Sequence, residues 1–202
     1  MSDGGTMDLR VLKTNELIRN TFLELLAQKE FTEISVKEIT VKARINRSTF
    51  YKHYEDKYLL RDSIIDHMLE EFIAYMDVNF LVADSMTSEK HREALKRCLK
   101  YFQSEKQNYQ LLWSSVMLGR NVFDEMVEAG AAYMKQCIMD HPGISPLRKE
   151  RGDWYGYLLI NNLLVSVRWW LRNDERVSLD EMTDQILEHM EKGAIPTLLE
   201  NV

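Results

Sequence analysis

Side chains able to contact DNA follow one another between residues 46 and 54. The segment from Arg47 to His53 reads RSTFYKH, in which hydroxyl and basic groups surround one phenylalanine. Phe50 and Tyr54 are four residues apart and share one face of a helix, which leaves the polar groups on the other face. A helix fits the major groove, where short polar groups reach base edges and basic groups and hydroxyls hold phosphates. We therefore predict a DNA-reading helix.

The positive charge of the chain is concentrated around this segment. The 202 residues carry a net charge of −6, which by itself disfavours binding to a polyanion. Residues 36–61 nevertheless contain seven basic and three acidic side chains. A small cationic face on an acidic body is typical of a nucleic-acid-binding module, and a solvated helical face would have the same pattern.

Capping residues indicate how this helix is positioned. Ser35 and Glu38 have the spacing of a capping box, which predicts the start of a short helix. Arg44 then lies in a turn, and Asn46 offers the N-cap of the reading helix. Two short helices joined by such a turn predict a helix-turn-helix, followed by a longer helix that Asp56 would cap.

The run from Phe31 to Lys57 resembles the DNA-binding region of the tetracycline repressor (TetR) family. The likeness extends from Ile18 to Leu60 and includes an aromatic-tyrosine-x-histidine-aromatic run at 50–54, with a lysine three residues later. The sequence departs from the family at two positions: the usual turn glycine is arginine 44 here, and the usual serine cap is asparagine 46. The arginine implies either a turn with negative φ or a tolerated left-handed residue.

The resemblance implies distinct roles for residues in this region. Tyr51, His53 and Lys57 would hold phosphates, and Thr49 and its neighbours would approach bases. We take Ser48, Thr49 and Lys52 as the base-edge candidates. The full set of predicted DNA contacts is Ser35, Lys37, Arg47, Ser48, Thr49, Tyr51, Lys52, His53 and Lys57.

Helical periodicity continues along the rest of the chain. The predicted helices cover residues 9–29, 36–43, 47–53, 57–78, 88–103, 107–117, 122–140, 148–173 and 178–192. We expect an all-α protein with a disordered terminus at 1–8, a three-helix helix-turn-helix domain at 9–56, a connecting helix at 57–78 and a larger helical-bundle domain for ligand binding and dimerisation at 79–202.

The segment from Trp154 to Trp170 is apolar almost all round, so it needs two partners. We predict a homodimer through the last two helices, about 148–173 and 178–192, with Leu179, Met182, Ile186 and Met190 completing a four-helix interface. The stretches Trp154–Tyr157, Trp169–Trp170 and Ser178–Met182 also resemble the C-terminal domain of a TetR subgroup common in Firmicutes.

TetR relatives typically bind a small ligand in this second domain. Aromatic and methionine side chains of the middle helices could line an apolar cavity, with Asn161 or Asn162 as polar contacts, although ordinary core packing is the commoner role for any one of these side chains. The candidate ligand residues are Tyr75, Tyr101, Phe102, Tyr109, Trp113, Met117, Tyr133, Met134 and Asn161.

Other chemistry finds little support in the sequence. Cys137 and His141 have metal-ligand spacing, but two ligands do not make a site, so no metal or cofactor is expected. Phosphate-binding loops and nucleophile signatures are lacking, which argues against an enzyme.

The longest uncharged run, 154–167, is too short to span a membrane. Two cysteines and no apolar leader predict a cytoplasmic protein.

These observations predict a ligand-responsive repressor that binds a near-palindromic operator as a dimer. The alternative is a helical protein-binding module of the same fold that has lost DNA binding.

Overall fold

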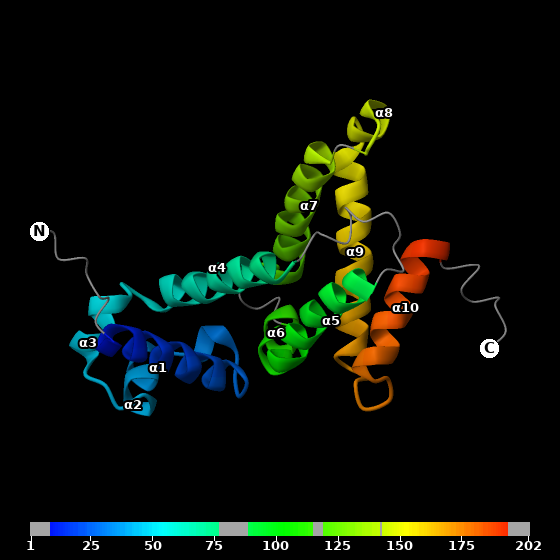
Figure 1. Cartoon of the computed structure of the whole chain (residues 1–202). Coiled ribbons are helices and arrows are strands. Elements are labelled where there is room, and N and C mark those ends of the chain that lie inside the picture. Colours follow the sequence, from blue (N-terminus) through cyan, green and yellow to red (C-terminus); the bar gives the residue numbers. More distant parts are fainter. Residues whose placement is uncertain (1–8, 77–88, 115–118, 142, 194–202) are drawn as a thin grey trace, which may run out of the picture. The chain divides into compact units, whose positions relative to one another are not determined.

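A computed structural model describes residues 9–76, 89–114, 119–141 and 143–193, and every regular element in these ranges is helical (Figure 1). No described helix is long and apolar enough to cross a lipid bilayer. Two compact units form. Among the described residues, those up to Met68 together with 113–121 make the first unit, and 69–112 with 122–193 make the second.

The first unit is built from short helices around one apolar core. Its elements are α1 (Leu9–Leu26), the 3₁₀ turn η1 (Phe31–Glu33), α2 (Val36–Lys42), α3 (Arg47–His53) and the beginning of α4 (Lys57–Tyr75). α1 packs on α2, and α2 packs on α3, as the predicted helix-turn-helix requires. The fully buried side chains of this core include Ile18, Phe22, Ile34, Ile39, Phe50 and Leu60.

The predicted caps that begin α2 and α4 are confirmed. Ser35 Oγ accepts a hydrogen bond from the Glu38 amide, and the Ser35 amide donates to Glu38 Oε2 at 2.9 Å. Asp56 Oδ1 accepts from the amides of residues 58 and 59, each at 2.8 Å. Asn46 has the extended backbone of an N-cap, but its side chain makes no capping hydrogen bond, so only part of that prediction holds.

Arg44 adopts the left-handed conformation, with φ of 54°, which resolves the question of how the turn proceeds. The Ile45 amide donates to the Thr40 carbonyl at 3.0 Å, and the Arg44 amide donates to the Val41 carbonyl at 3.2 Å. These two bonds form a Schellman motif, whose central position normally holds glycine because other residues are strained there.

We expect Arg44→Gly to raise the free energy of unfolding by about 0.5–1 kcal/mol, since it removes the strain of a Cβ at positive φ. Urea denaturation followed by circular dichroism measures the change. Arg44→Ala is the matched control because it shortens the side chain but keeps the Cβ. An equal gain in the alanine variant would show that the arginine side chain, and not the backbone strain, is responsible.

The second unit contains the longer helices. They are α5 (Glu89–Ser104), α6 (Lys106–Ser114, of which the last two residues belong to the first unit), α7 (Val122–Asp140), α8 (Pro146–Lys149), α9 (Gly152–Trp170) and α10 (Leu179–Lys192), and the end of α4 joins them. The predicted ends of α4 near residue 78 and of α6 near residue 117 lie outside the described residues. The remaining predicted boundaries match within three residues, apart from the one helix expected over 148–173.

The prediction of a single helix over 148–173 is wrong. α8 ends at Lys149, and Arg151, with φ of −106° and ψ of 22°, leaves the helical region before α9 begins. This change of direction sets Gly152 against α7, where an added Cβ would lie 3.6 Å from Ile138 Cγ2. Residues 148–151 read RKER and are all good helix formers, which explains why the sequence pattern contained no sign of the break.

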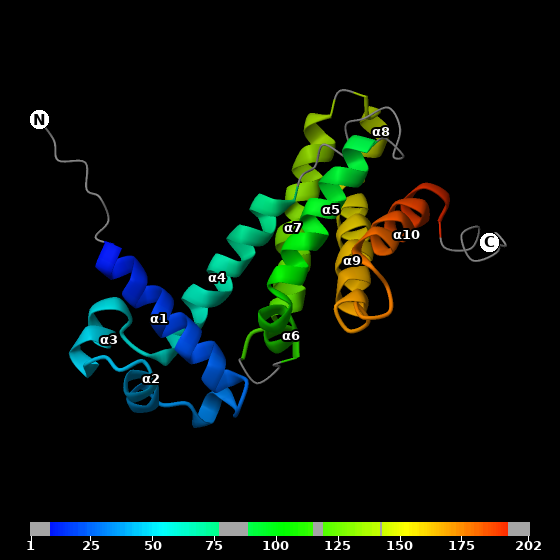
Figure 2. The ribbon, with the colours of Figure 1, turned by 60° about the horizontal axis from the view of Figure 1, so that its bottom comes forward.

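α7 and α9 run side by side over most of their length, as both views show (Figures 1 and 2). Glycines permit this close approach. A Cβ on Gly156 would lie 2.6 Å from the Ala131 carbonyl oxygen, and one on Gly130 would lie 2.4 Å from Ile160 Cγ1. The pair forms the centre of the second unit.

Candidate nucleic-acid interface

The two faces of α3 differ in the predicted sense. Phe50 is fully buried and Tyr54 is nearly so, and their rings lie 5.9 Å apart. The outer face carries exposed Arg47, Ser48, Tyr51 and Lys52, while Thr49 and His53 are half-buried. The buried pair therefore anchors α3 in the core of the unit and leaves a polar, basic surface toward solvent.

Basic groups on α2 extend this surface. Lys37 is exposed, and its ammonium forms no hydrogen bond or ion pair among the described residues. Lys42 instead pairs with Glu24 of α1 at 3.1 Å. The exposed cations near α3 that form no ion pair among the described residues are thus Lys37, Arg44, Arg47 and Lys52, which suits them to attract phosphates.

Lys57 has a different environment from the one predicted for it. Its ammonium donates to three backbone carbonyls around η1: to Phe31 at 2.9 Å, to Thr32 at 3.1 Å and to Ile34 at 2.7 Å. The same nitrogen lies 4.6 Å from the centre of the Phe31 ring. Burial lowers the pKa of Lys57, whereas the three carbonyls favour its protonated form. All three N–H donors are in use, so we reassign Lys57 from phosphate binding to holding η1 against the start of α4.

Ser35 is likewise occupied. Its hydroxyl donates to Glu38 Oε2 at 2.8 Å while it accepts from the Glu38 amide. Glu38 also pairs with Lys29 at the end of α1, and these bonds, that from Lys29 foremost, lower the pKa of Glu38 to about 2. A phosphate that accepts the Ser35 hydroxyl hydrogen would displace only Glu38 Oε2 from it and would leave the capping box intact, so Ser35 initiates α2 and its predicted phosphate contact stays a prediction.

Four of the candidate ligand residues gather in the second unit. Tyr75 and Tyr101 stack with ring centres 4.0 Å apart, and Phe102 and Tyr109 contact at 4.7 Å. The Tyr109 hydroxyl donates to Tyr101, which donates to Glu71 Oε2 at 3.2 Å. Burial raises the pKa of both Tyr101 and Tyr109. The cluster is a packed aromatic group with one carboxylate at its edge.

The other candidate ligand residues have different surroundings. The Tyr133 hydroxyl donates to the Met76 carbonyl, and Met134 is buried on α7. The Asn161 amide donates to the Tyr157 carbonyl of its own helix. Trp113 belongs to the first unit, and Met117 lies outside the described residues.

α10 buries part of its apolar stripe within its own protomer, and the dimer contact through the last two helices stays a prediction. Met182 and Ile186 are buried within the second unit, where α10 packs mainly on α5, while Leu179 and Met190 are half-buried. Periodicity identified the stripe, but it could not identify the partner. α9, in contrast, presents large apolar side chains to solvent, namely Trp154, Tyr157, Leu158, Val165 and Trp169.

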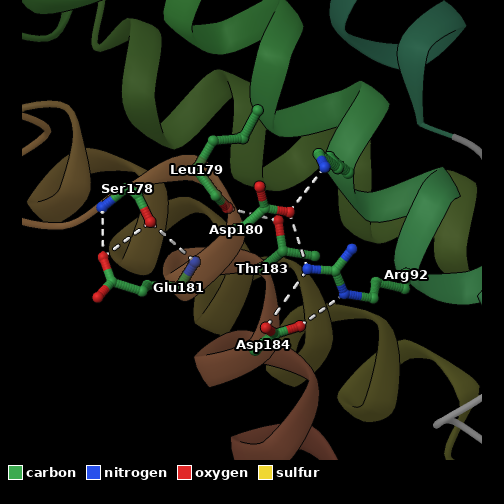
Figure 3. A network of polar contacts seen from close by, with 8 residues as sticks. Arg92, Ser178, Leu179, Asp180, Glu181, Thr183 and Asp184 are labelled. Carbon is green, nitrogen blue, oxygen red and sulfur yellow. Dashed lines mark hydrogen bonds and ion pairs between the residues drawn. The ribbon is translucent and has the colours of Figure 1, made fainter.

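A polar network holds α10 on α5 (Figure 3). Arg92 donates to Asp184 through Nε and to Asp180 through Nη2, each at 2.8 Å, and Lys96 donates to Asp180 at 2.6 Å. The bonds from Lys96, foremost, and from Arg92 lower the pKa of Asp180. A capping box between Ser178 and Glu181 starts the helix that carries both aspartates.

One further tether was not predicted from the sequence. Arg120, between α6 and α7, donates to Asp62 and Asp66 of α4, each at 3.1 Å. The two aspartates are four residues apart and share a helix face, but their partner is more than 50 residues away in the chain. Only the spacing of Asp62 and Asp66 could have hinted at such a cation.

Comparisons with known proteins relate this geometry to a known fold. No family model matches the chain. A TetR transcriptional regulator from Streptococcus agalactiae is 21% identical, with a TM-score of 0.59 over 92% of this chain and 97% of that one. A TetR/AcrR-family regulator from Aquifex aeolicus is 19% identical, with a TM-score of 0.63 over 88% and 97%. The chain has the TetR fold.

One relative found by sequence comparison is likewise named as a helix-turn-helix (HTH) regulator. It is the uncharacterised HTH-type transcriptional regulator YxbF of Bacillus subtilis, 22% identical over 173 residues, which make up 85% of this chain. The matched part is 43% of the relative, so the chain spans less than half of that protein's length. These relatives are described as transcriptional regulators and not as enzymes.

Proposed function

We propose that this TetR-fold chain is a DNA-binding transcriptional regulator that inserts α3 of each of two protomers into the major groove. The observation that carries the proposal is the exposed polar and basic face of α3, fixed from beneath by buried Phe50 and Tyr54. The regulator names of its relatives support the same function. A cytoplasmic location would follow from this role.

The outer residues of α3 divide into two groups by chemistry. Ser48, Thr49 and Lys52 have short or flexible donors that can reach base edges, and these residues would read the sequence. Lys37, Tyr51 and His53 would position the protein on the backbone, because phosphate oxygens accept hydrogen bonds whatever the base.

Dimerisation would use the exposed apolar stripe of α9. Trp154, Leu158, Val165 and Trp169 follow one another at intervals of four, seven and four residues, which sets them along one helix face. A contiguous apolar face is unfavourable in water and is covered best by an identical face on a second copy. Two copies would present two reading helices to an operator with two-fold symmetry.

Regulation would pass through a small-molecule effector in the second unit. The aromatic cluster of Tyr75, Tyr101, Phe102 and Tyr109 is the candidate contact surface, because it combines apolar rings with hydroxyls and the Glu71 carboxylate. In its simplest form the bound dimer is a repressor that covers its operator.

Selection from a random duplex pool tests the proposed function. The full chain should enrich an inverted repeat whose half-sites lie about one helical turn, or a multiple of it, apart. Thr49→Ala and Lys52→Ala should then change the preferred half-site, whereas Lys37→Ala should weaken all sequences alike. Lack of enrichment even at low salt would contradict DNA binding and favour a protein-binding module.

A further inference from the structure

Arg47 and Tyr51 are joined on the exposed face of α3, one turn apart. Arg47 Nη2 donates to Tyr51 Oη at 3.0 Å, and Arg47 Nε lies 3.4 Å from the same oxygen. The guanidinium carbon is 5.4 Å from the centre of the tyrosine ring. One edge of the guanidinium is therefore directed at the phenol.

The pair has hydrogen-bond donors left over. Arginine has five N–H donors, and at most two point at Tyr51, so the second edge of the guanidinium remains available. The Tyr51 oxygen accepts from Arg47, which leaves its own hydrogen to donate. Among the described residues no acceptor takes that hydrogen, and Arg47 forms no ion pair. The pair thus lacks an acceptor that could serve both residues.

A phosphate matches this set of donors better than a base edge does. A guanine presents only N7 and O6 in the major groove, and a bidentate arginine uses both of them. A phosphate carries anionic oxygens with enough lone pairs for the guanidinium edge and the phenol together. A hydroxyl that accepts from a cation is also a stronger donor, which favours an anionic acceptor.

We propose, on the basis of the proposed function, that Arg47 and Tyr51 form a single phosphate clamp. Arg47 is a positioning residue in this clamp: it orients the Tyr51 hydroxyl and shares its phosphate, and it takes no part in base reading. Sequence reading on α3 then falls to Ser48, Thr49 and Lys52.

A double-mutant cycle on the selected duplex tests the clamp. Arg47→Ala and Tyr51→Phe should each weaken binding about tenfold, because each removes charge-assisted hydrogen bonds to the phosphate. The double variant should lose little more affinity than the single variant that binds more weakly, since either change disrupts the clamp. Each loss should be the same on every duplex with one substituted base pair, and Arg47→Ala should reduce the salt slope by about one.

Two further variants control this experiment. Arg47→Lys keeps the charge but not the planar fork of the guanidinium. It should therefore retain the salt slope, and combining it with Tyr51→Phe should show no coupling energy between the two positions. Lys52 is expected to read a base, so Lys52→Ala should change the preferred sequence. Circular dichroism of each variant checks that α3 still folds.

Two results would overturn the clamp. One is a change of preferred base at a half-site position in Arg47→Ala, and the other is multiplication of the two losses to about a hundredfold in the double variant. If the unaltered protein selects no duplex at all, the proposed function fails and the clamp fails with it. Selective binding with independent losses refutes the clamp alone.

Discussion

Lys57→Met is expected to lower the free energy of unfolding by about 2 kcal/mol, because three carbonyls lose their charged donor. The acceptors belong to Phe31, Thr32 and Ile34, which surround η1 and precede α2. Methionine preserves the length of the side chain and its contact with the Phe31 ring. The value is below the sum of three charged hydrogen bonds because the lysine is only half-buried, and water can reach part of the site.

Urea denaturation of the first unit, followed by fluorescence or circular dichroism, measures this effect. Lys37→Met is the matched control, since Lys37 is an exposed lysine on α2 without a described partner. It should change the free energy of unfolding by less than about 0.5 kcal/mol. Equal stability of the two variants would contradict the structural role of Lys57 and restore it as a candidate phosphate contact.

Gly156→Ala is expected to destabilise the second unit by about 1–3 kcal/mol, the usual cost of an overpacked core. The new Cβ would lie 2.6 Å from the Ala131 carbonyl oxygen and 3.3 Å from the Lys135 amide nitrogen. Both atoms belong to the backbone of α7, so no side-chain rotation relieves the clash. α7 and α9 must move apart, which opposes the small gain in helix propensity that alanine brings.

Gly152→Ala is the control for this variant. It lies on the same helix and is also buried, but its Cβ would meet side chains at 3.6 Å or more, which is ordinary contact. Thermal unfolding should therefore separate the two variants, with Gly152→Ala close to the unaltered protein. A similar loss of thermal stability in both variants would indicate that any methyl group added to α9 is destabilising. The close approach of α7 at Gly156 would then have no special role.

Local signals in the sequence located the elements that carry the candidate interface. The helix predicted at Arg47–His53 has those bounds in the structure, because Phe50 and Tyr54 define its inner face within two turns. The capping boxes at Ser35 and Ser178 were equally readable, since each depends on residues three positions apart. Signals of this kind need no knowledge of the tertiary structure.

Features that depend on distant partners could not be read in this way. Lys57 matches a phosphate-binding pattern, yet its acceptors lie 23 to 26 residues earlier in the chain. The apolar stripe of α10 has the period of an interface helix, but α5 covers it within the protomer. In both cases the sequence identified a side chain that needs a partner, and the fold decided which partner it has.

Chemical interference mapping on the selected duplex tests the central claim, that α3 enters the major groove, most directly. Methylation at guanine N7 marks the major groove, and methylation at adenine N3 marks the minor groove. We predict that N7 methylation blocks binding in two clusters, one per half-site, separated by about one helical turn or a multiple of it. Interference confined to adenine N3, or absent from both grooves while the duplex is still bound, would contradict the claim.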